Sequence, residues 1–127
     1  MPTVLIVDDE QHIRLLIEQT LEELEDEGVQ IVTARDGAEA LEVVEAQPPD
    51  LVFLDVDMPR KNGFEVCRAI KHDLGLTGTY VAMLTAKGQA VDHEVGTAAG
   101  ADVYLTKPFD PDALLRRARE VLGLDGR

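Results

Sequence analysis

The sequence predicts a single α/β domain built on an open, doubly wound sheet of five parallel strands. Short runs rich in Val, Ile and Leu, typical of strands buried on both faces, alternate with longer stretches whose apolar residues recur with a helical period. This alternation favours parallel strands joined by right-handed crossovers, with helices on both faces of the sheet. Five strands are too few for a closed eight-stranded barrel, so we expect an open sheet of order 2-1-3-4-5.

The first half of the chain carries three of these strands and two helices. Gly28 ends the first helical region, Asp36 can cap the second helix, and Pro48-Pro49 closes it. The expected elements are a strand at Thr3–Val7, a helix with Ile13, Leu16, Ile17, Leu21 and Leu24 on one face, a strand at Val29–Ala34, a helix with Ala40, Leu41 and Val44 facing inward, and a strand at Leu51–Leu54.

Helix signals in the second half are of unequal strength. Asp110-Pro111 strongly indicates a helix start, because a capping carboxylate precedes a proline at the first helical position. The expected elements are a helix from Asn62-Gly63 with Phe64, Cys67 and Ile70 inward, a strand at Tyr80–Leu84, a weakly apolar helix at Ala90–Ala99 interrupted by Gly96, a strand at Val103–Leu105, and a final helix carrying Leu114, Leu115, Ala118, Val121 and Leu122.

Length and charge limit the function classes. The 127 residues fit one domain over residues 1–127, and a chain of this size can bury roughly two-thirds of its unfolded surface. The formal net charge of −13 opposes binding to nucleic acid or an anionic membrane, and favours cations and basic partners. The single cysteine, Cys67, excludes an internal disulfide and is expected in the core. Without a basic leader or a membrane-length apolar stretch, the expected location is the cytoplasm.

Acidic side chains gather where the predicted strands end. Asp8 and Asp9 follow the first strand and Asp55 the third, while Thr85 and Lys107 follow the fourth and fifth. In an open parallel sheet of this order, ligands bind at the carboxyl ends of the neighbouring first and third strands. Two like charges about 4 Å apart repel by roughly 4 kcal/mol at an effective dielectric constant of about 20, so the cluster favours a hard divalent cation such as Mg²⁺. With that cation bound, one aspartate could attack a phosphoryl group whose oxygens pair with Lys107.

Together these strand ends resemble the receiver domain of bacterial two-component response regulators, above all the free-standing chemotaxis-type receivers. The resemblance covers nearly the whole chain, and four motifs in the right order make it specific. They are Val7-Asp8-Asp9, Leu54-Asp55-Val56-Asp57-Met58-Pro59 with Asn62-Gly63, Leu84-Thr85-Ala86, and Tyr104-Leu105-Thr106-Lys107-Pro108-Phe109. The flavodoxin-like fold of that family agrees with the fold that the strand pattern predicts.

The resemblance implies a phosphorylation-controlled signalling switch. Asp55 would be the residue that a histidine kinase phosphorylates in a Mg²⁺-dependent reaction. Asp8, Asp9 and Asp55 would be metal ligands, with Asp8 acting partly through water, and the backbone carbonyl of Asp57 would be a further ligand. Asp57 and Lys87 occupy positions that tune phosphoryl lifetime in the family, and their opposite charges could pair at the mouth of the site.

The fourth and fifth strands would carry the switch. Thr85 and Tyr104 match the family's pair of switch residues, although a threonine or tyrosine at a strand end is often only structural. Lys107 matches the lysine that pairs with the phosphoryl group. The Lys107-Pro108 bond matches one that is cis in the family, whereas X-Pro bonds in general favour trans.

The partners implied are a sensor histidine kinase or a histidine phosphotransfer protein, and a downstream protein target. The target would bind the face formed by the weak Ala90–Ala99 helix, the fifth strand and the last helix. Arg116, Arg117 and Arg119 cluster there, which fits either a partner contact or a set of cations near a helix C-terminus. We expect no direct contact with nucleic acid or membrane, and a monomer or a phosphorylation-dependent homodimer.

Other functions remain open at this point. Asp55-Val56-Asp57 resembles the nucleophile motif of haloacid-dehalogenase-type phosphatases, an enzyme class that also uses Mg²⁺, although there the motif follows the first strand. A phosphorylation-independent scaffold or a flavin carrier could share the fold, but Asp8-Asp9-Glu10 would repel a flavin phosphate. The same acidic run could also simply cap the first helix.

Overall fold

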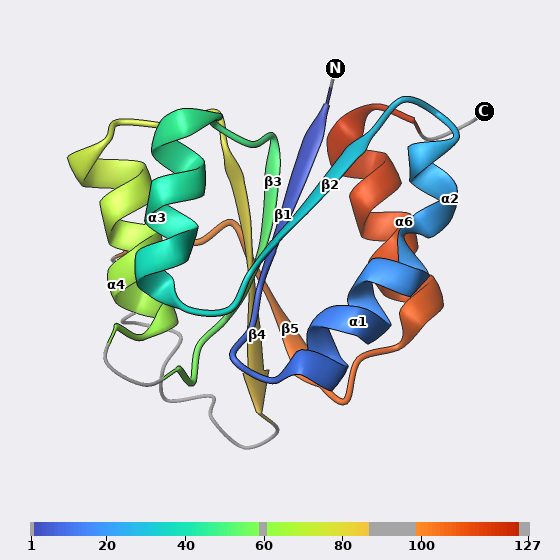
Figure 1. Cartoon of the computed structure of the whole chain (residues 1–127), viewed down its shortest axis with the longest axis horizontal. Helices are drawn as coiled ribbons and strands as arrows, with labels where there is room; N and C mark the ends of the chain where they lie inside the picture. The colour runs from blue at the N-terminus through green and yellow to red at the C-terminus, as the bar shows by residue number, and fades with distance from the viewer. Residues whose placement is uncertain (1, 59–60, 87–98, 125–127) are drawn as a thin grey trace.

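The sheet has the predicted topology. The computed structural model describes residues 2–58, 61–86 and 99–124. All strand pairings are parallel, and the order is β2-β1-β3-β4-β5 (Figure 1). The strands are β1 (Thr3–Val7), β2 (Gln30–Ala34), β3 (Leu51–Asp55), β4 (Tyr80–Ala86) and β5 (Val103–Lys107).

Helices cover both faces of the sheet, as predicted. In Figure 1, α3 and α4 lie on one face, and α1, α2 and α6 lie on the other. The helices are α1 (Gln11–Thr20), α2 (Glu22–Glu25), α3 (Gly37–Ala46), α4 (Gly63–Arg68), which a π-helical turn η1 (Ala69–Asp73) extends, and α6 (Pro111–Leu122). The predicted helix Ala90–Ala99 lies outside the described residues except for Ala99, which is buried.

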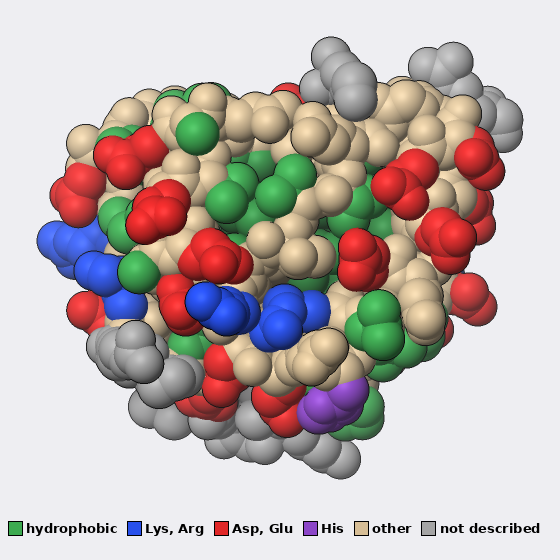
Figure 2. All heavy atoms as spheres, viewed as in Figure 1, with side chains coloured by type: hydrophobic (Ala, Val, Ile, Leu, Met, Phe, Trp, Pro, Cys, Tyr) green, Lys and Arg blue, Asp and Glu red, His purple; other side chains and the backbone are tan. Residues whose placement is uncertain are grey.

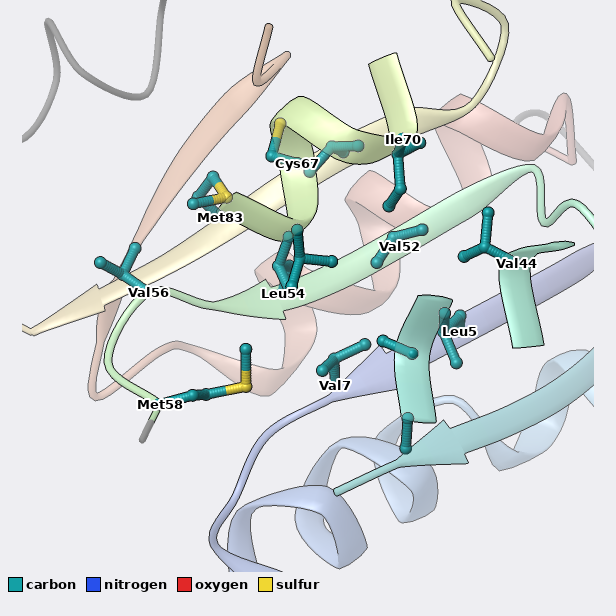
Figure 3. Packing of buried hydrophobic residues seen from close by; sticks show 14 of the residues in the cluster. Leu5, Val7, Val44, Val52, Leu54, Val56, Met58, Cys67, Ile70 and Met83 are labelled. Carbon is teal, nitrogen blue, oxygen red and sulfur yellow. The ribbon is translucent and has the colours of Figure 1, made fainter. Parts of the chain in front are cut away.

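Two apolar clusters fill the spaces between the sheet and its helices. Figure 3 shows the first, in which Leu5, Val7, Val52 and Leu54 of the central strands meet Val44 and the α4 side chains, including Cys67. The second packs the opposite face of the same strands against α1, α2 and α6. Every residue of β1 and β3 is buried, whereas no residue of the edge strand β5 is fully buried.

The predicted helix starts are confirmed by their capping contacts. The Asp36 carboxylate accepts a hydrogen bond from the Glu39 N–H, and Asp110 accepts one from Asp112 with Pro111 at the start of α6. Asn62 and Glu65 form a reciprocal capping box at the start of α4. These contacts fix where each helix leaves the edge of the sheet that carries the acidic residues.

Several boundaries differ from the sequence prediction: β2 begins at Gln30 instead of Val29, and β3 ends at Asp55 instead of Leu54. The first helix is broken at Leu21, where the backbone departs from helical geometry (φ −94°, ψ 2°). The residue before it, Thr20, donates its hydroxyl hydrogen bond to the Leu16 carbonyl, a contact that bends helices. Strands β4 and β5 also run further than predicted, so Thr85 and Lys107 lie within the parallel ladder.

The surface reflects the acidic composition. Acidic side chains are spread over the visible face in Figure 2 and are not gathered into one patch. Among the described residues, no helix has the length and apolarity needed to cross a membrane.

Candidate functional site

Two buried carboxylates and one lysine meet at the carboxyl edge of the sheet. Asp8 follows β1 and is fully buried, and Asp55 at the end of the neighbouring β3 is 3% exposed. Lys107 reaches them from β5: its Nζ lies 3.0 Å from Asp8 Oδ2 and 3.1 Å from Asp55 Oδ1. The predicted convergence of these three residues is therefore confirmed, and it places two negative charges on one positive charge.

The excess negative charge shows in the protonation equilibria. Burial, together with the nearby Asp8 carboxylate, raises the pKa of Asp55 to about 7, against the opposing effects of Lys107 and of a hydrogen bond from the Asp57 N–H. Burial also disfavours the charged form of Lys107. Its hydrogen bond to Asp8 and the charges of both carboxylates outweigh that effect and raise the pKa of the ammonium.

Asp8 is held by the loop that follows β1 and by the first turn of α1. The Glu10 N–H donates to Asp8 Oδ1 at 2.9 Å, and the Arg14 guanidinium donates to the Asp8 carbonyl at 2.7 Å. Glu10 precedes α1 without making a side-chain capping bond, so the hypothesis that this acidic run only caps the helix is wrong for Glu10. The sequence does not reveal the role of Arg14, because an arginine on an amphipathic helix is usually solvated. In the structure Arg14 is half-buried.

The residues present fit a hard divalent cation. Asp8, Asp9 and Glu10 can bring one carboxylate oxygen each within 4.8 Å of one another. Carboxylate oxygens are the donors that Mg²⁺ prefers, and among the described residues the buried Asp8 and Asp55 share a single lysine, Lys107. Glu10 was not among the predicted ligands, and its proximity follows from the tight turn after β1.

The loop after β3 folds back onto the phosphoacceptor candidate. The Asp57 N–H donates to Asp55 Oδ1 at 3.3 Å, while its own side chain is exposed. The Gly63 N–H donates to the Val56 carbonyl at 3.0 Å, and the Val56 N–H donates to Leu84 of β4 at 3.0 Å. The start of α4 is thus bonded directly to the backbone that carries Asp55.

Thr85 and Tyr104 lie on the same face of two paired strands. Met83 pairs with Tyr104 in the β4–β5 ladder, and Thr85 follows two residues later, so alternation points it to the same side as Met83. Thr85 is 4% exposed, and the half-buried Tyr104 packs against the cluster beneath α3 and α4. The Lys107-Pro108 bond is cis. Lys87 lies outside the described residues, so its predicted pairing with Asp57 stays a prediction.

Two further residues named in the sequence analysis, Cys67 and Arg119, make contacts that support the fold. Cys67 is buried in the core, as predicted, and burial raises the pKa of its thiol to about 11. Arg119 pairs with Glu23 and Glu27, tying α6 to the region of α2.

Comparison with known proteins adds independent evidence. The family profile of the response regulator receiver domain matches residues 4–119. The alkaline phosphatase synthesis transcriptional regulatory protein PhoP of Bacillus subtilis is 40% identical over 119 residues, covering 94% of this chain and 48% of that protein. The transcriptional regulatory protein CpxR of Escherichia coli is 38% identical over 122 residues, covering 96% and 50%. The chain therefore spans about half the length of the curated relatives it matches.

A solved structure gives the same result at the level of the fold. The Vibrio cholerae chemotaxis protein CheY4 superimposes with a TM-score of 0.83 at 36% identity, over 95% of this chain and 98% of that one. The sheet order, the acidic edge and the profile match agree with the motifs read from the sequence. This chain belongs to the response regulator receiver domain family.

Proposed function

We propose that this receiver domain is a signalling switch whose Asp55 accepts a phosphoryl group from a phosphohistidine of a histidine kinase or a histidine phosphotransfer protein. The observation that carries the proposal is the Lys107 ammonium held between the Asp8 and Asp55 carboxylates, 3.0 and 3.1 Å away. Lys107 contacts Oδ1 of Asp55, so the other carboxylate oxygen can react. The ammonium can then pair with the oxygens of the transferred phosphoryl group.

The transfer is a displacement at phosphorus. An Asp55 carboxylate oxygen forms the new P–O bond, and the P–N bond to the donor imidazole breaks. The bonding electron pair stays on the imidazole nitrogen, which keeps or takes up a proton from solvent. The product is an acyl phosphate that carries about −1.5 to −2 charge at one buried point, in place of the single negative charge of the carboxylate.

Asp8, Asp9, Asp55 and the backbone carbonyl of Asp57 would hold Mg²⁺, with Glu10 close enough to contribute. When bound, the cation supplies positive charge against the phosphoryl oxygens. Asp8 is itself kept in place by the Glu10 N–H and by Arg14, so the protein presents this carboxylate in a fixed orientation.

The conformational switch would involve β4 and β5. The Thr85 hydroxyl would donate to a phosphoryl oxygen, and the Tyr104 ring would turn inward on the same face of the sheet. A modification that moves a two-state equilibrium from 1:99 to 99:1 must favour one state by about 5.5 kcal/mol, which a charge-assisted hydrogen bond, a lysine pair and the cation can supply together.

The face that includes β5 and α6 would then bind a downstream protein. The receiver would act either as a monomer or as a phosphorylation-dependent homodimer. We place this activity in the cytoplasm, without direct nucleic-acid or membrane binding and without turnover of a small-molecule substrate.

The test is intact mass after incubation with acetyl phosphate and Mg²⁺. We expect the wild type to gain one phosphoryl group, and we expect Asp55→Asn and the wild type with excess chelator to gain none. Continuous release of phosphate from several small phosphate esters would instead support the phosphatase alternative. A folded wild type that no donor, including a phosphohistidine protein, can label would contradict the proposal.

The lifetime of the acyl phosphate gives a second prediction. If Asp57 and Lys87 pair at the mouth of the site, they govern together how water reaches the phosphoryl group. We expect Asp57→Ala and Lys87→Ala to change the dephosphorylation rate by amounts that are not additive in the double variant. The rates are measured after removal of the phosphodonor, and strictly additive effects would contradict the pairing.

A further inference from the structure

We propose that Asp102, held by Lys71, fixes the register of the edge strand β5 and so positions the Lys107 ammonium at the acidic site. Asp102 lies just before β5, at the opposite end of the strand from Lys107. The kinetic part of this proposal rests on the proposed phosphorylation of Asp55, and its structural part does not.

Asp102 forms two hydrogen bonds with the backbone of one residue of β4, Val81. Its Oδ2 accepts a hydrogen bond from the Val81 N–H at 2.7 Å, and its own N–H donates to the Val81 carbonyl at 2.9 Å. The ladder that follows pairs Ala82 with Val103 and continues to Ala86 with Lys107. The two bonds to Val81 therefore define the first step of that ladder.

Lys71 supplies the charge that holds Asp102. Its Nζ lies 2.9 Å from Asp102 Oδ2 and 3.4 Å from the Thr77 carbonyl, and its side chain is only 8% exposed. Lys71 belongs to the π-helical turn η1, a rare geometry that is frequent at functional sites. The aliphatic part of the Lys71 side chain packs closely against Gly100, since a Cβ added to Gly100 would lie only 3.0 Å from Lys71 Cγ. This close packing keeps the side chain in place.

The apolar pattern specifies the register of β5 less strongly than that of the central strands. Register is specified most strongly where a face of the strand is buried, because a slip by one residue moves every side chain to the other face. In contrast to the wholly buried β1 and β3, β5 has no fully buried residue, and its ladder is formed with β4 alone. A shift by one residue would carry Lys107 about 3.3 Å along the strand, out of reach of the two carboxylates.

A double-mutant cycle separates positioning from general stability. We expect Asp102→Ala to slow Asp55 phosphorylation by acetyl phosphate and Mg²⁺ by about tenfold, the effect of losing roughly one charged hydrogen bond. In a Lys107→Ala background the same change should have almost no further effect, because the lysine that it positions is gone. Lys71→Met should resemble Asp102→Ala, and Lys71→Arg should restore the rate. Arg119→Ala is the control, since it removes ion pairs to Glu23 and Glu27 that involve neither Asp102 nor Lys107, and it should leave the rate unchanged.

A second readout does not depend on phosphorylation. The acetylation rate of the Lys107 amine by acetic anhydride, read by peptide mass spectrometry, should rise about tenfold in Asp102→Ala, because a lysine released from the two carboxylates is more accessible to the reagent. Asp102→Asn, which keeps an acceptor for the Val81 N–H and folds more readily, should show a smaller rise. If the wild type takes no phosphoryl group, the proposed function fails. The Lys107 labelling still tests whether Asp102 positions Lys107. Unchanged Lys107 labelling, or equal slowing in both backgrounds of the cycle, would overturn the positioning role.

Discussion

Replacing Asp55 with Asn is expected to stabilise the metal-free protein by on the order of 4 kcal/mol near pH 8, and by less than half of that near pH 5. The reason is the raised pKa of Asp55, about 7 in the folded chain against an ordinary value of 3.8, which arises first from burial and then from Asp8. Between these two values the folded state holds a proton that the unfolded state has released. Raising the pH through this window therefore destabilises the wild type, and the neutral amide removes that loss.

The measurement is the free energy of unfolding by urea in excess chelator at both pH values. Asp73→Asn is the matched control, because it makes the same change at an exposed position and should stay within about 0.5 kcal/mol of the wild type. Adding Mg²⁺ should raise the stability of the wild type more than that of Asp55→Asn, if Asp55 is a metal ligand. A destabilised Asp55→Asn at pH 8 would show that Lys107 compensates both carboxylates fully.

The sequence was sufficient to predict that Asp8, Asp55 and Lys107 meet. The alternation of strands and helices predicts an open parallel sheet, for which 2-1-3-4-5 is a common order, and that order places the ends of β1 and β3 side by side. The family resemblance added roles for Thr85 and Tyr104, which neither composition nor spacing would assign. The apolar pattern placed the carboxyl ends of β3, β4 and β5 to within two residues, which was close enough to bring the site residues together.

Contacts between side chains and distant backbone could not be predicted in this way. Arg14 on the Asp8 carbonyl and Asp102 on Val81 each join segments that no periodicity relates. Lys71 is a lysine in a helical stretch, where solvent exposure is the usual expectation, whereas in the structure it is buried within the π-helical turn. The break at Leu21 likewise depends on a local hydroxyl contact one residue earlier, and an uninterrupted apolar face from Ile13 to Leu24 conceals it.

Gly63→Ala is expected to destabilise the protein by at least about 3 kcal/mol, although alanine is the better helix former by roughly 1 kcal/mol. A Cβ at this position would collide with the Asp55 carbonyl oxygen and lie 2.9 Å from Val56 Cα. Both are main-chain atoms that cannot rotate away, so either α4 or the end of β3 must move. The Gly63 N–H also donates to the Val56 carbonyl at 3.0 Å, and a displaced helix start would lose that bond.

Because the clash involves the backbone of Asp55 itself, stability and function should fail together in Gly63→Ala. We expect a lower urea midpoint and, in the fraction that remains folded, slower labelling of Asp55 by acetyl phosphate. Gly78→Ala is the control: a Cβ there meets no atom within 4 Å and the backbone is outside the left-handed region, so its midpoint should stay level or rise slightly. Wild-type stability in Gly63→Ala would mean that α4 can withdraw from β3 at little cost. The close approach of the helix to the main chain of Asp55 and Val56 would then not be needed for the stability of the domain.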